Sequence, residues 1–231
     1  MGIVINALAI SVSSLTGSIF KSRISNNNLG ILGISIIITS LVGFFENIYN
    51  VTEGTLESAG LMIVLFCLIL GNILGEKLNI DGKLSHLVKC KSNSLNSVID
   101  ATLFFGVGGL QICGPILLAV NGDNSQLILK SIIDIPFAII FGATYGKIVM
   151  LSALPVATMQ IVITMIAFFT NAFLSNDLIS QLCSMGYIIL FFSGFNLLVD
   201  SKHKINNVNM VPGIFMIILF HSIMGIKEMI L

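Results

Sequence analysis

The stretch Lys130–Gly146, KSIIDIPFAIIFGATYG, has the apolar character of a membrane-spanning helix and also carries an acid, Asp134. About 20 mostly apolar residues cross the hydrocarbon core of a bilayer as a helix. Here the apolar residues do not alternate with polar ones, so the stretch predicts a helix and not a strand of a closed barrel. A carboxylate at this depth is costly unless it is paired or hydrated, which makes Asp134 the first candidate functional group.

The composition of the whole chain supports a membrane location. Of the 231 residues, 55% are hydrophobic and only 10% are charged, and the mean hydropathy is +1.01. In a soluble domain, roughly a quarter of the residues are charged. This chain has far fewer, so its surface is expected to face the lipid bilayer. The 11 basic and 11 acidic residues balance. There is no basic excess of the kind that binds nucleic acid, so we expect no nucleic-acid partner.

Apolar runs of spanning length recur along the chain and predict an all-α, polytopic transmembrane helix bundle that forms a single domain over residues 1–231. The polar stretch 76–98 is expected to be a cytoplasmic loop with an interfacial helix. The count is about eight spans, or seven if the fifth and sixth join at the tight turn YGKIVMLSALP (145–155). The predicted spans are 2–20, 29–48, 57–75, 99–120, 127–146, 150–172, 179–199 and 209–227.

The distribution of Lys and Arg predicts the orientation of these spans. Loops on the cytoplasmic side of a membrane protein carry an excess of basic residues. Only Lys130 and Lys227 fall on one side of this chain, which is therefore expected to face outward with both termini. The expected cytoplasmic set is Lys21, Arg23, Lys77, Lys83, Lys89, Lys91, Lys147, Lys202 and Lys204.

Three spans that are expected to run in the same direction each carry two small residues four positions apart. Such pairs let two helix backbones approach closely. Ordinary helix packing explains them, and a degenerate internal repeat is an alternative. The pairs are Ser13 with Gly17, Gly71 with Gly75, and Gly142 with Gly146.

Two interpretations of Asp134 remain open. Lys130 stands one helical turn before it, so an intrahelical ion pair would neutralise the carboxylate while the lysine reaches the outer interface. Alternatively, Asp134 is a proton or cation site, and Pro136 two residues later frees a backbone carbonyl beside it.

The stretch FFGVGGLQICGPIL (104–117) predicts a broken helix. Gly106, Gly108, Gly109 and Gly114 weaken it, and Pro115 interrupts it. Non-helical backbone at membrane depth persists only inside protein or beside a wet cavity, so the break would offer carbonyls or amides to a solute. The alternative is a close helix crossing through glycine. Gln111 places an amide at about the middle of this span.

Further amides at membrane depth are Asn6, Asn72, Gln160 and Asn196. Singly, such groups usually form hydrogen bonds between helices. Together with Asp134 and Gln111 they would line a polar path, which we place between spans one, four, five and seven. Motifs of metalloproteases, serine hydrolases and nucleotide-binding loops do not occur, so no catalytic residue, metal or cofactor is expected and the chain is not expected to be an enzyme.

Five segments carry a resemblance to a known family: MGIVINALAI…SLTGSIFKSRI (1–10 and 14–24), LGNILGEKLNIDGKL (70–84), LFFGVGGLQICGPI (103–116), LKSIIDIPFAIIFGATYG (129–146) and GFNLLVDSKHKINNVNMVPGI (194–214). Over nearly its whole length the chain resembles bacterial integral membrane proteins of the family "domain of unknown function 554", the YdfK/YqgA type. Ser13 stands where this family usually has glycine. The family residues that match are Asn6, Gly75, Asp81, Gly106, Asp134, Gly146, Asn196, Asn209 and Pro212.

The resemblance implies a multi-pass protein of the bacterial inner membrane and no established activity. The polar groups favour a transporter or channel for a small solute or ion, with Asp134 as the ion site. The alternative is a non-transporting scaffold or regulatory subunit that binds partner helices through its small-residue faces, and a homo-oligomer is compatible with either.

Overall fold

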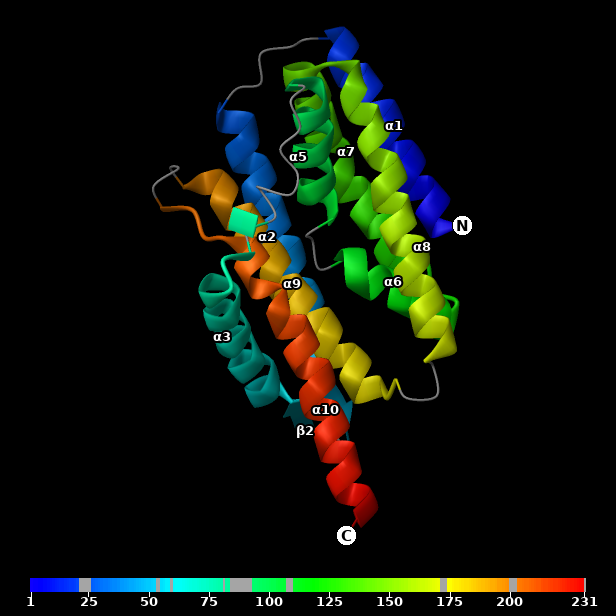
Figure 1. The fold of residues 1–231 in the computed structure, drawn as a ribbon, viewed down its shortest axis with the longest axis vertical. Coiled ribbons are helices and arrows are strands. Elements are labelled where there is room, and N and C mark those ends of the chain that lie inside the picture. Colours follow the sequence, from blue (N-terminus) through cyan, green and yellow to red (C-terminus); the bar gives the residue numbers. More distant parts are fainter. Residues whose placement is uncertain are drawn as a thin grey trace. The chain divides into compact units, whose positions relative to one another are not determined.

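The structure is a computed structural model that describes residues 1–20, 26–52, 55–58, 60–80, 82–83, 93–106, 110–170, 174–199 and 203–230. The chain is almost entirely helical (Figure 1). The elements are α1 (Gly2–Phe20), α2 (Asn26–Ile48), β1 (Tyr49–Thr52), β2 (Thr55–Ser58), α3 (Leu61–Lys77), α5 (Asn93–Gly106), α6 (Leu110–Asn121), α7 (Ser125–Tyr145), η1 (Lys147–Ser152), α8 (Ala153–Phe169), α9 (Asn176–Leu198), η4 (Asn207–Met210) and α10 (Pro212–Ile230).

The predicted all-α, polytopic bundle is confirmed, since every predicted span contains a helix or a pair of helices. In the described part, five segments are long and apolar enough to cross a membrane by themselves: α1, α2, α7, α9, and η1 together with α8. The helix pair α5–α6 makes a sixth if it is one span, bent by 57° at its break. The remaining two predicted spans contain α3, which has 17 residues, and the shorter apolar segment Asn207–Ile223.

Two boundaries differ from the sequence-based expectation. Strands β1 and β2 form an antiparallel hairpin in which Tyr49 pairs with Ser58, so α3 begins at Leu61 rather than at residue 57. Helix α5 begins at Asn93, inside the predicted loop 76–98. The fifth and sixth predicted spans are two distinct helices as expected, because α7 ends at Tyr145 and α8 follows η1. Residues 81 and 84–92 of the predicted loop, with Asp81 and Lys91, lie outside the described residues, as do Lys21 and Lys202.

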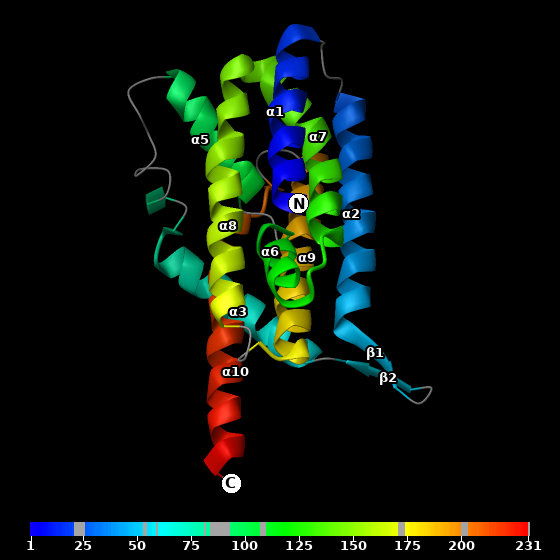
Figure 2. The same ribbon diagram turned by 90° about the vertical axis from the view of Figure 1, so that its right-hand side faces the viewer.

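The chain forms two compact units, and each is described by itself. Unit 1 comprises Met1–Leu32 and Ser85–Phe173, and unit 2 comprises Gly33–Leu84 and Leu174–Leu231. In unit 1, α1 and α7 run parallel along each other (Figure 2). A Cβ atom added to Gly2 would lie 2.7 Å from Leu127 Cβ, and one added to Gly142 would lie 2.0 Å from the Ser14 carbonyl oxygen. Contacts at both ends of the pair show that the two helices point the same way.

The α1–α7 contact is close because glycine stands on both sides of it. A Cβ atom on Gly17 would lie 2.1 Å from the carbonyl oxygen of Ile139, closer than real Cβ atoms come to any atom. Without these two side chains, the backbones gain dispersion contacts along the crossing. Gly17 and Gly142 therefore act as helix-packing residues.

Gly146 does not have the packing role that the small-residue spacing predicts. It has φ of +84°, and a Cβ atom on it would meet nothing within 4 Å. Its backbone N–H donates to the carbonyl of Gly142, 2.9 Å away, and ends α7. Glycine is favoured here because its conformation is left-handed, as at many helix C-termini.

The start of α7 is tied to the start of α1. The first amide of α1, on Gly2, donates to Asn124 Oδ1 at 2.7 Å. The four N-terminal amides of a helix lack partners within the helix, so Asn124 satisfies one of them from a neighbouring element. Beside it, hydrogen bonds from the Ser125 backbone and hydroxyl hold the pKa of the exposed Asp123 carboxyl below its usual range.

Helices α5, α6 and α8 complete unit 1. Segment η1 contacts α5, and α8 contacts α6, so η1–α8 runs in the same direction as α5–α6. Fully buried apolar side chains such as Phe105, Leu127 and Val156 fill the interior of the unit. Many apolar side chains on the outer faces of these helices remain exposed, as expected for a surface in lipid.

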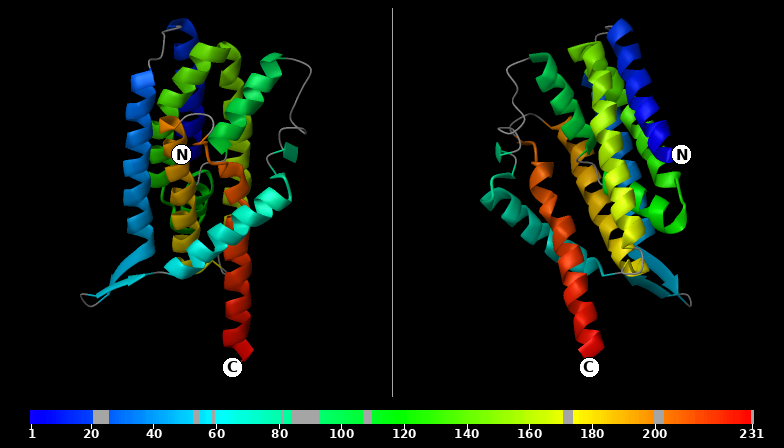
Figure 3. Two further views of the ribbon diagram at one scale, coloured as in Figure 1. Left: turned by 90° about the vertical axis from the view of Figure 1, so that its left-hand side faces the viewer. Right: turned by 45° about the vertical axis from the view of Figure 1, so that its right-hand side comes forward.

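Unit 2 is built from antiparallel helix pairs that cross at glycine. Helix α3 crosses α10 (Figure 3), where a Cβ atom on Gly71 would lie 2.3 Å from Gly213 N and one on Gly75 would lie 2.2 Å from the Asn209 carbonyl oxygen. Helix α2 meets α9 at Gly33 and Gly194. Gly71 and Gly75 thus pack against an antiparallel partner, whereas Gly17 and Gly142 pack two parallel helices together. The internal repeat stays a prediction.

Candidate functional site

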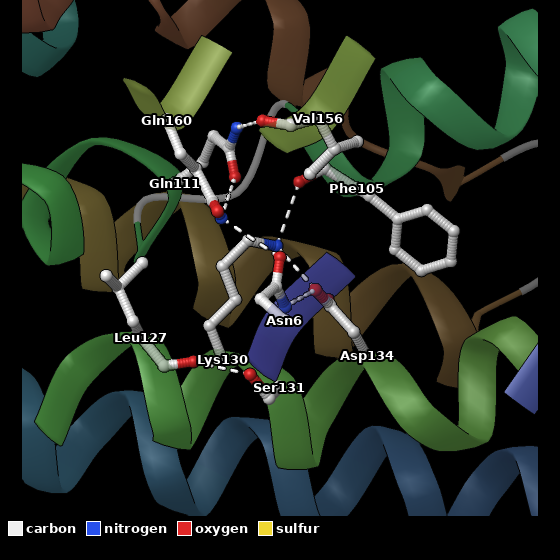
Figure 4. A network of polar contacts seen from close by, with 9 residues as sticks. All are labelled: Asn6, Phe105, Gln111, Leu127, Lys130, Ser131, Asp134, Val156 and Gln160. Carbon is white, nitrogen blue, oxygen red and sulfur yellow. Dashed lines mark hydrogen bonds and ion pairs between the residues drawn. The ribbon is translucent and has the colours of Figure 1, made fainter. Parts of the chain in front are cut away.

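The interior of unit 1 contains a hydrogen-bonded network of charged and amide side chains (Figure 4). Its side chains are Asn6 of α1, Gln111 of α6, Lys130 and Asp134 of α7, and Gln160 of α8. We call these five residues the polar cluster. Each has an exposed fraction of at most 5%. Helix α1 and the three consecutive helices α6, α7 and α8 therefore meet at polar groups within an otherwise apolar bundle.

The centre of the polar cluster is an ion pair. Lys130 Nζ lies 2.7 Å from Asp134 Oδ2, across one turn of α7. The same carboxylate oxygen accepts a hydrogen bond of 2.8 Å from Asn6 Nδ2 of α1. Helix α7 continues through Pro136 without interruption from Ser125 to Tyr145, so both charges project from one helix.

The position of Lys130 near the start of its span predicts that the ammonium reaches outward to the interface. In the structure it does not. Its ammonium is buried and donates to the backbone carbonyl of Phe105 at 3.0 Å. Phe105 lies in the last turn of α5, where the carbonyls lack partners within the helix. The negative end of the α5 dipole attracts a cation, so Lys130 points inward because the broken helix supplies a partner there.

Gln160 connects the charged pair to α6. Its Nε2 donates to Asn6 Oδ1 at 3.0 Å and to Gln111 Oε1 at 2.9 Å. Gln111 Nε2 in turn donates to the backbone carbonyl of Val156 at 3.1 Å. Among the described residues, the buried Oε1 atom of Gln160 has no hydrogen-bond partner. One acceptor of the polar cluster is thus unsatisfied where Gln160 joins the charged pair to α6.

The depth of the polar cluster follows from helix geometry. Asp134 lies nine residues after the start of α7 at Ser125, and Gln160 lies nine residues before the end of α8 at Phe169. At about 1.5 Å per residue, both are about 14 Å from these helix ends. The hydrocarbon core of a bilayer is about 30 Å thick, so the polar cluster lies near the middle of the membrane.

Two of the sequence-predicted path residues lie elsewhere. Asn72 belongs to unit 2 and donates to Glu76 one turn away on α3, at 3.2 Å. Asn196, also in unit 2, binds the backbone of Ile205 with both amide atoms, at 2.7 and 2.8 Å. Each binds a partner close in sequence, a side chain for Asn72 and the backbone for Asn196. Of the predicted path amides, the polar cluster thus contains Asn6, Gln111 and Gln160, and the path itself stays a prediction.

The predicted helix break is partly visible. Gly106 ends α5 and Gly114 packs within α6 against Leu127, whereas Gly108 and Gly109 lie outside the described residues. Sequence reasoning expected the break to offer backbone groups to a solute, and did not foresee that Lys130 would bind the Phe105 carbonyl. The position of Lys130 within an apolar run is a signal that its ammonium has a partner inside the bundle.

Replacing Gln160 with methionine is expected to lower the free energy of unfolding by about 2 to 4 kcal/mol. The change preserves the length of the side chain but leaves Asn6 Oδ1 and Gln111 Oε1 without their donor, and each unsatisfied buried acceptor costs about 1 to 3 kcal/mol. Denaturant unfolding in detergent micelles measures the loss. The control is Thr158→Val on an exposed face of α8, where the hydroxyl only bonds its own helix; equal losses in both variants would contradict the network.

Within the described ranges, no three His, Cys, Asp or Glu side chains lie together in a way that could hold a metal ion. The chemistry available in the polar cluster is therefore that of one carboxylate, one ammonium and three amides. Such a set binds ions and hydrogen-bonding groups through charge and dipoles.

Comparison with known proteins supplies the family. The model of a family described as "Protein of unknown function (DUF554)" matches residues 1–222. The chain belongs to this family. It is also 27% identical, over 218 residues that cover 92% of each chain, to a Bacillus subtilis (strain 168) protein named "Uncharacterized membrane protein YdfK". No solved structure matches. This DUF554 family member is a multi-pass membrane protein, as its relative's name and its apolar helices indicate.

Proposed function

We propose that the protein is a transporter or channel for a small solute or ion, with the polar cluster as its binding site in the membrane. The observation that carries the proposal is the buried Lys130–Asp134 pair, joined to the amides of three other helices near the middle of the membrane. Ionisable groups at this depth are rare and usually mark the pathway of a substrate or ion.

The energetics of buried ion pairs favour this proposal over a purely structural role. Removing two charges from water costs about as much as their attraction returns, so an apolar pair of similar volume would hold the helices as well or better. The unsatisfied Oε1 atom of Gln160 also favours a binding site, because an unpaired buried acceptor lowers stability and helix packing alone does not require it. A site whose side chains exchange their present partners for a solute accounts for both the buried ion pair and the unpaired oxygen.

The proposal includes a location and an orientation. We place the protein in the bacterial inner membrane, with the basic loops in the cytoplasm, including the described residues Lys83 and Lys147. In this proposal its partners are the lipid bilayer and a small solute or ion. The protein then needs no cofactor and performs no enzymatic reaction. A homo-oligomer is compatible with this function.

The test is flux through reconstituted protein. Liposomes that contain the purified chain are expected to conduct at least one of H⁺, ²²Na⁺ or ⁸⁶Rb⁺ faster than protein-free liposomes. Replacing Asp134 with asparagine is expected to reduce that flux by at least about tenfold, because the carboxylate that attracts the cation is lost while the shape is kept. Trapped pH dye and tracer uptake measure the three rates.

The matched control is Asp123→Asn, which removes an exposed acid just before the same helix. This variant is expected to retain the flux of the unchanged protein. Full flux in a folded Asp134→Asn protein would contradict the site, and the absence of flux for all three ions would contradict cation transport.

A second function, a membrane scaffold or regulatory subunit, is favoured by one observation: Lys130 and Asp134 satisfy each other within one helix, next to a close α1–α7 packing. In that case the polar cluster only fastens helices together. No ion in the flux assay would then be transported, and no solute would stabilise the purified protein, although Lys130 and Asp134 would still be strongly coupled in a double-mutant cycle.

A further inference from the structure

We propose that the Lys130 ammonium occupies a preformed site for a monovalent cation, and that a small cation or a protonated primary amine binds there when the ammonium leaves. The ligands are the Asp134 carboxylate and the Phe105 backbone carbonyl. The inference rests on the proposed function for its role in transport, since it names the class of ligand that the site takes. The existence of the site is tested without measuring transport.

The geometry around Nζ is that of a bound cation. Its two partners are oxygen atoms from different helices, 2.7 Å away at Asp134 Oδ2 and 3.0 Å away at the Phe105 carbonyl. One oxygen belongs to a carboxylate, whose negative charge is shared over its two oxygens, and the other carries the partial charge of a carbonyl. The Asn6 amide donates to the same Oδ2 at 2.8 Å and holds the carboxylate in place.

Helix α5 strengthens the site because it ends there. Phe105 is the penultimate residue of α5, and the next helix begins at Leu110 with a bend of 57°. The aligned peptide dipoles give the C-terminus of a helix roughly half a negative charge, located on the last carbonyls. Transporters commonly bind coupling cations at such ends of discontinuous helices near the middle of the membrane.

The cation in this structure is tethered and therefore removable. Lys130 is joined to α7 by a flexible four-carbon chain, so its ammonium can leave while the backbone of the site stays in place. A tethered group competes with free ions at a high effective concentration. The ammonium therefore occupies the site in nearly all molecules of the unchanged protein at equilibrium, and added cations are expected to shift its Tm little. Transport uses the intervals in which the ammonium has left, and the site becomes permanently accessible once the lysine side chain is shortened.

The experiment uses full-length Lys130→Ala protein in detergent micelles. This change leaves the carboxylate and the carbonyl in place and removes three carbons and the ammonium, a space that matches n-propylammonium. Thermal unfolding is followed as n-propylammonium, K⁺ or Na⁺ chloride replaces choline chloride at constant ionic strength. We expect n-propylammonium at millimolar concentration to raise the Tm of Lys130→Ala by roughly 3 °C or more, with K⁺ and Na⁺ having smaller effects.

Two controls define the site. The unchanged protein, in which the ammonium is present, and the double variant Lys130→Ala with Asp134→Asn, in which the charged ligand is lost, are both expected to show shifts below about 1 °C. Equal shifts in all three proteins would mean a general salt effect and would overturn the proposal. So would a folded Lys130→Ala protein that does not respond.

A variant that fails to fold still gives an answer. If Lys130→Ala elutes as an aggregate in choline but as a single species in n-propylammonium, the site is supported. If Lys130→Ala aggregates in both salts, the experiment uses Lys130→Met instead. A folded Lys130→Met protein that neither K⁺ nor Na⁺ stabilises would overturn the proposal. Cation binding without flux in liposomes would refute transport and keep the site, whereas flux without cation binding would refute only the site.

Discussion

Replacing Asp134 with leucine is expected to lower the free energy of unfolding by about 3 to 5 kcal/mol, the typical cost of removing one partner of a buried ion pair. The Lys130 ammonium would remain buried, with the Phe105 carbonyl as its remaining hydrogen-bond partner among the described residues. The Asn6 amide would also lose its acceptor on α7. Unfolding in mixed micelles, followed by helix content, measures the loss.

The double variant Lys130→Met with Asp134→Leu is the matched comparison. It removes both charges at similar volume, so we expect it to recover most of the stability that the single variant loses. A coupling free energy above about 1 kcal/mol between the two positions would establish the pair. Purely additive losses would show that the two charges do not stabilise each other in the membrane.

Replacing Gly142 with alanine is expected to cost about 3 kcal/mol or more, at the upper end of the range for overpacking. The added Cβ atom would lie 2.0 Å from the Ser14 carbonyl oxygen and 2.8 Å from its carbon. These are backbone atoms, so no side chain can move aside and α1 must separate from α7. Separation would also weaken the contact from Asn6 to Asp134. Thermal unfolding of the purified variant measures the loss.

Gly106→Ala is the control for this substitution. Among the described residues, its Cβ atom would meet only the flexible Met159 side chain, at 3.4 and 3.5 Å, which is ordinary van der Waals contact. We expect a change within about 0.5 kcal/mol. If Gly142→Ala were equally mild, the close approach of α1 and α7 would be wrong.

The helices were predictable because lipid leaves the backbone few choices. With no water to bind N–H and C=O groups, each apolar segment of spanning length satisfies them within itself as a helix. The hairpin of β1 and β2 was not predicted, because this rule applies to long apolar segments and the hairpin is not one of them. Its hydrogen bonds depend on the pairing of two four-residue strands, which hydropathy does not reveal.

The membership of the polar cluster was only partly predictable. Asn6, Gln111 and Gln160 could be named because amides are rare at membrane depth, but Asn196 has the same signature and instead binds the nearby backbone of Ile205. Which amide meets Asp134 depends on how helices far apart in sequence pack. The inward direction of Lys130 likewise depended on α5 ending beside it, a tertiary feature that no local pattern of α7 encodes.

The parallel contact of α1 with α7 has a consequence for how the protein is made. The first helix leaves the ribosome long before its partner: Gly2 and Asn124, which bind each other, are 122 positions apart. At about 5 to 20 residues per second, translation takes roughly 6 to 24 s to cover that distance. During this time Asn6 has no access to its carboxylate, so the nascent first span must be held by water, lipid headgroups or the insertion machinery until Asp134 enters the membrane.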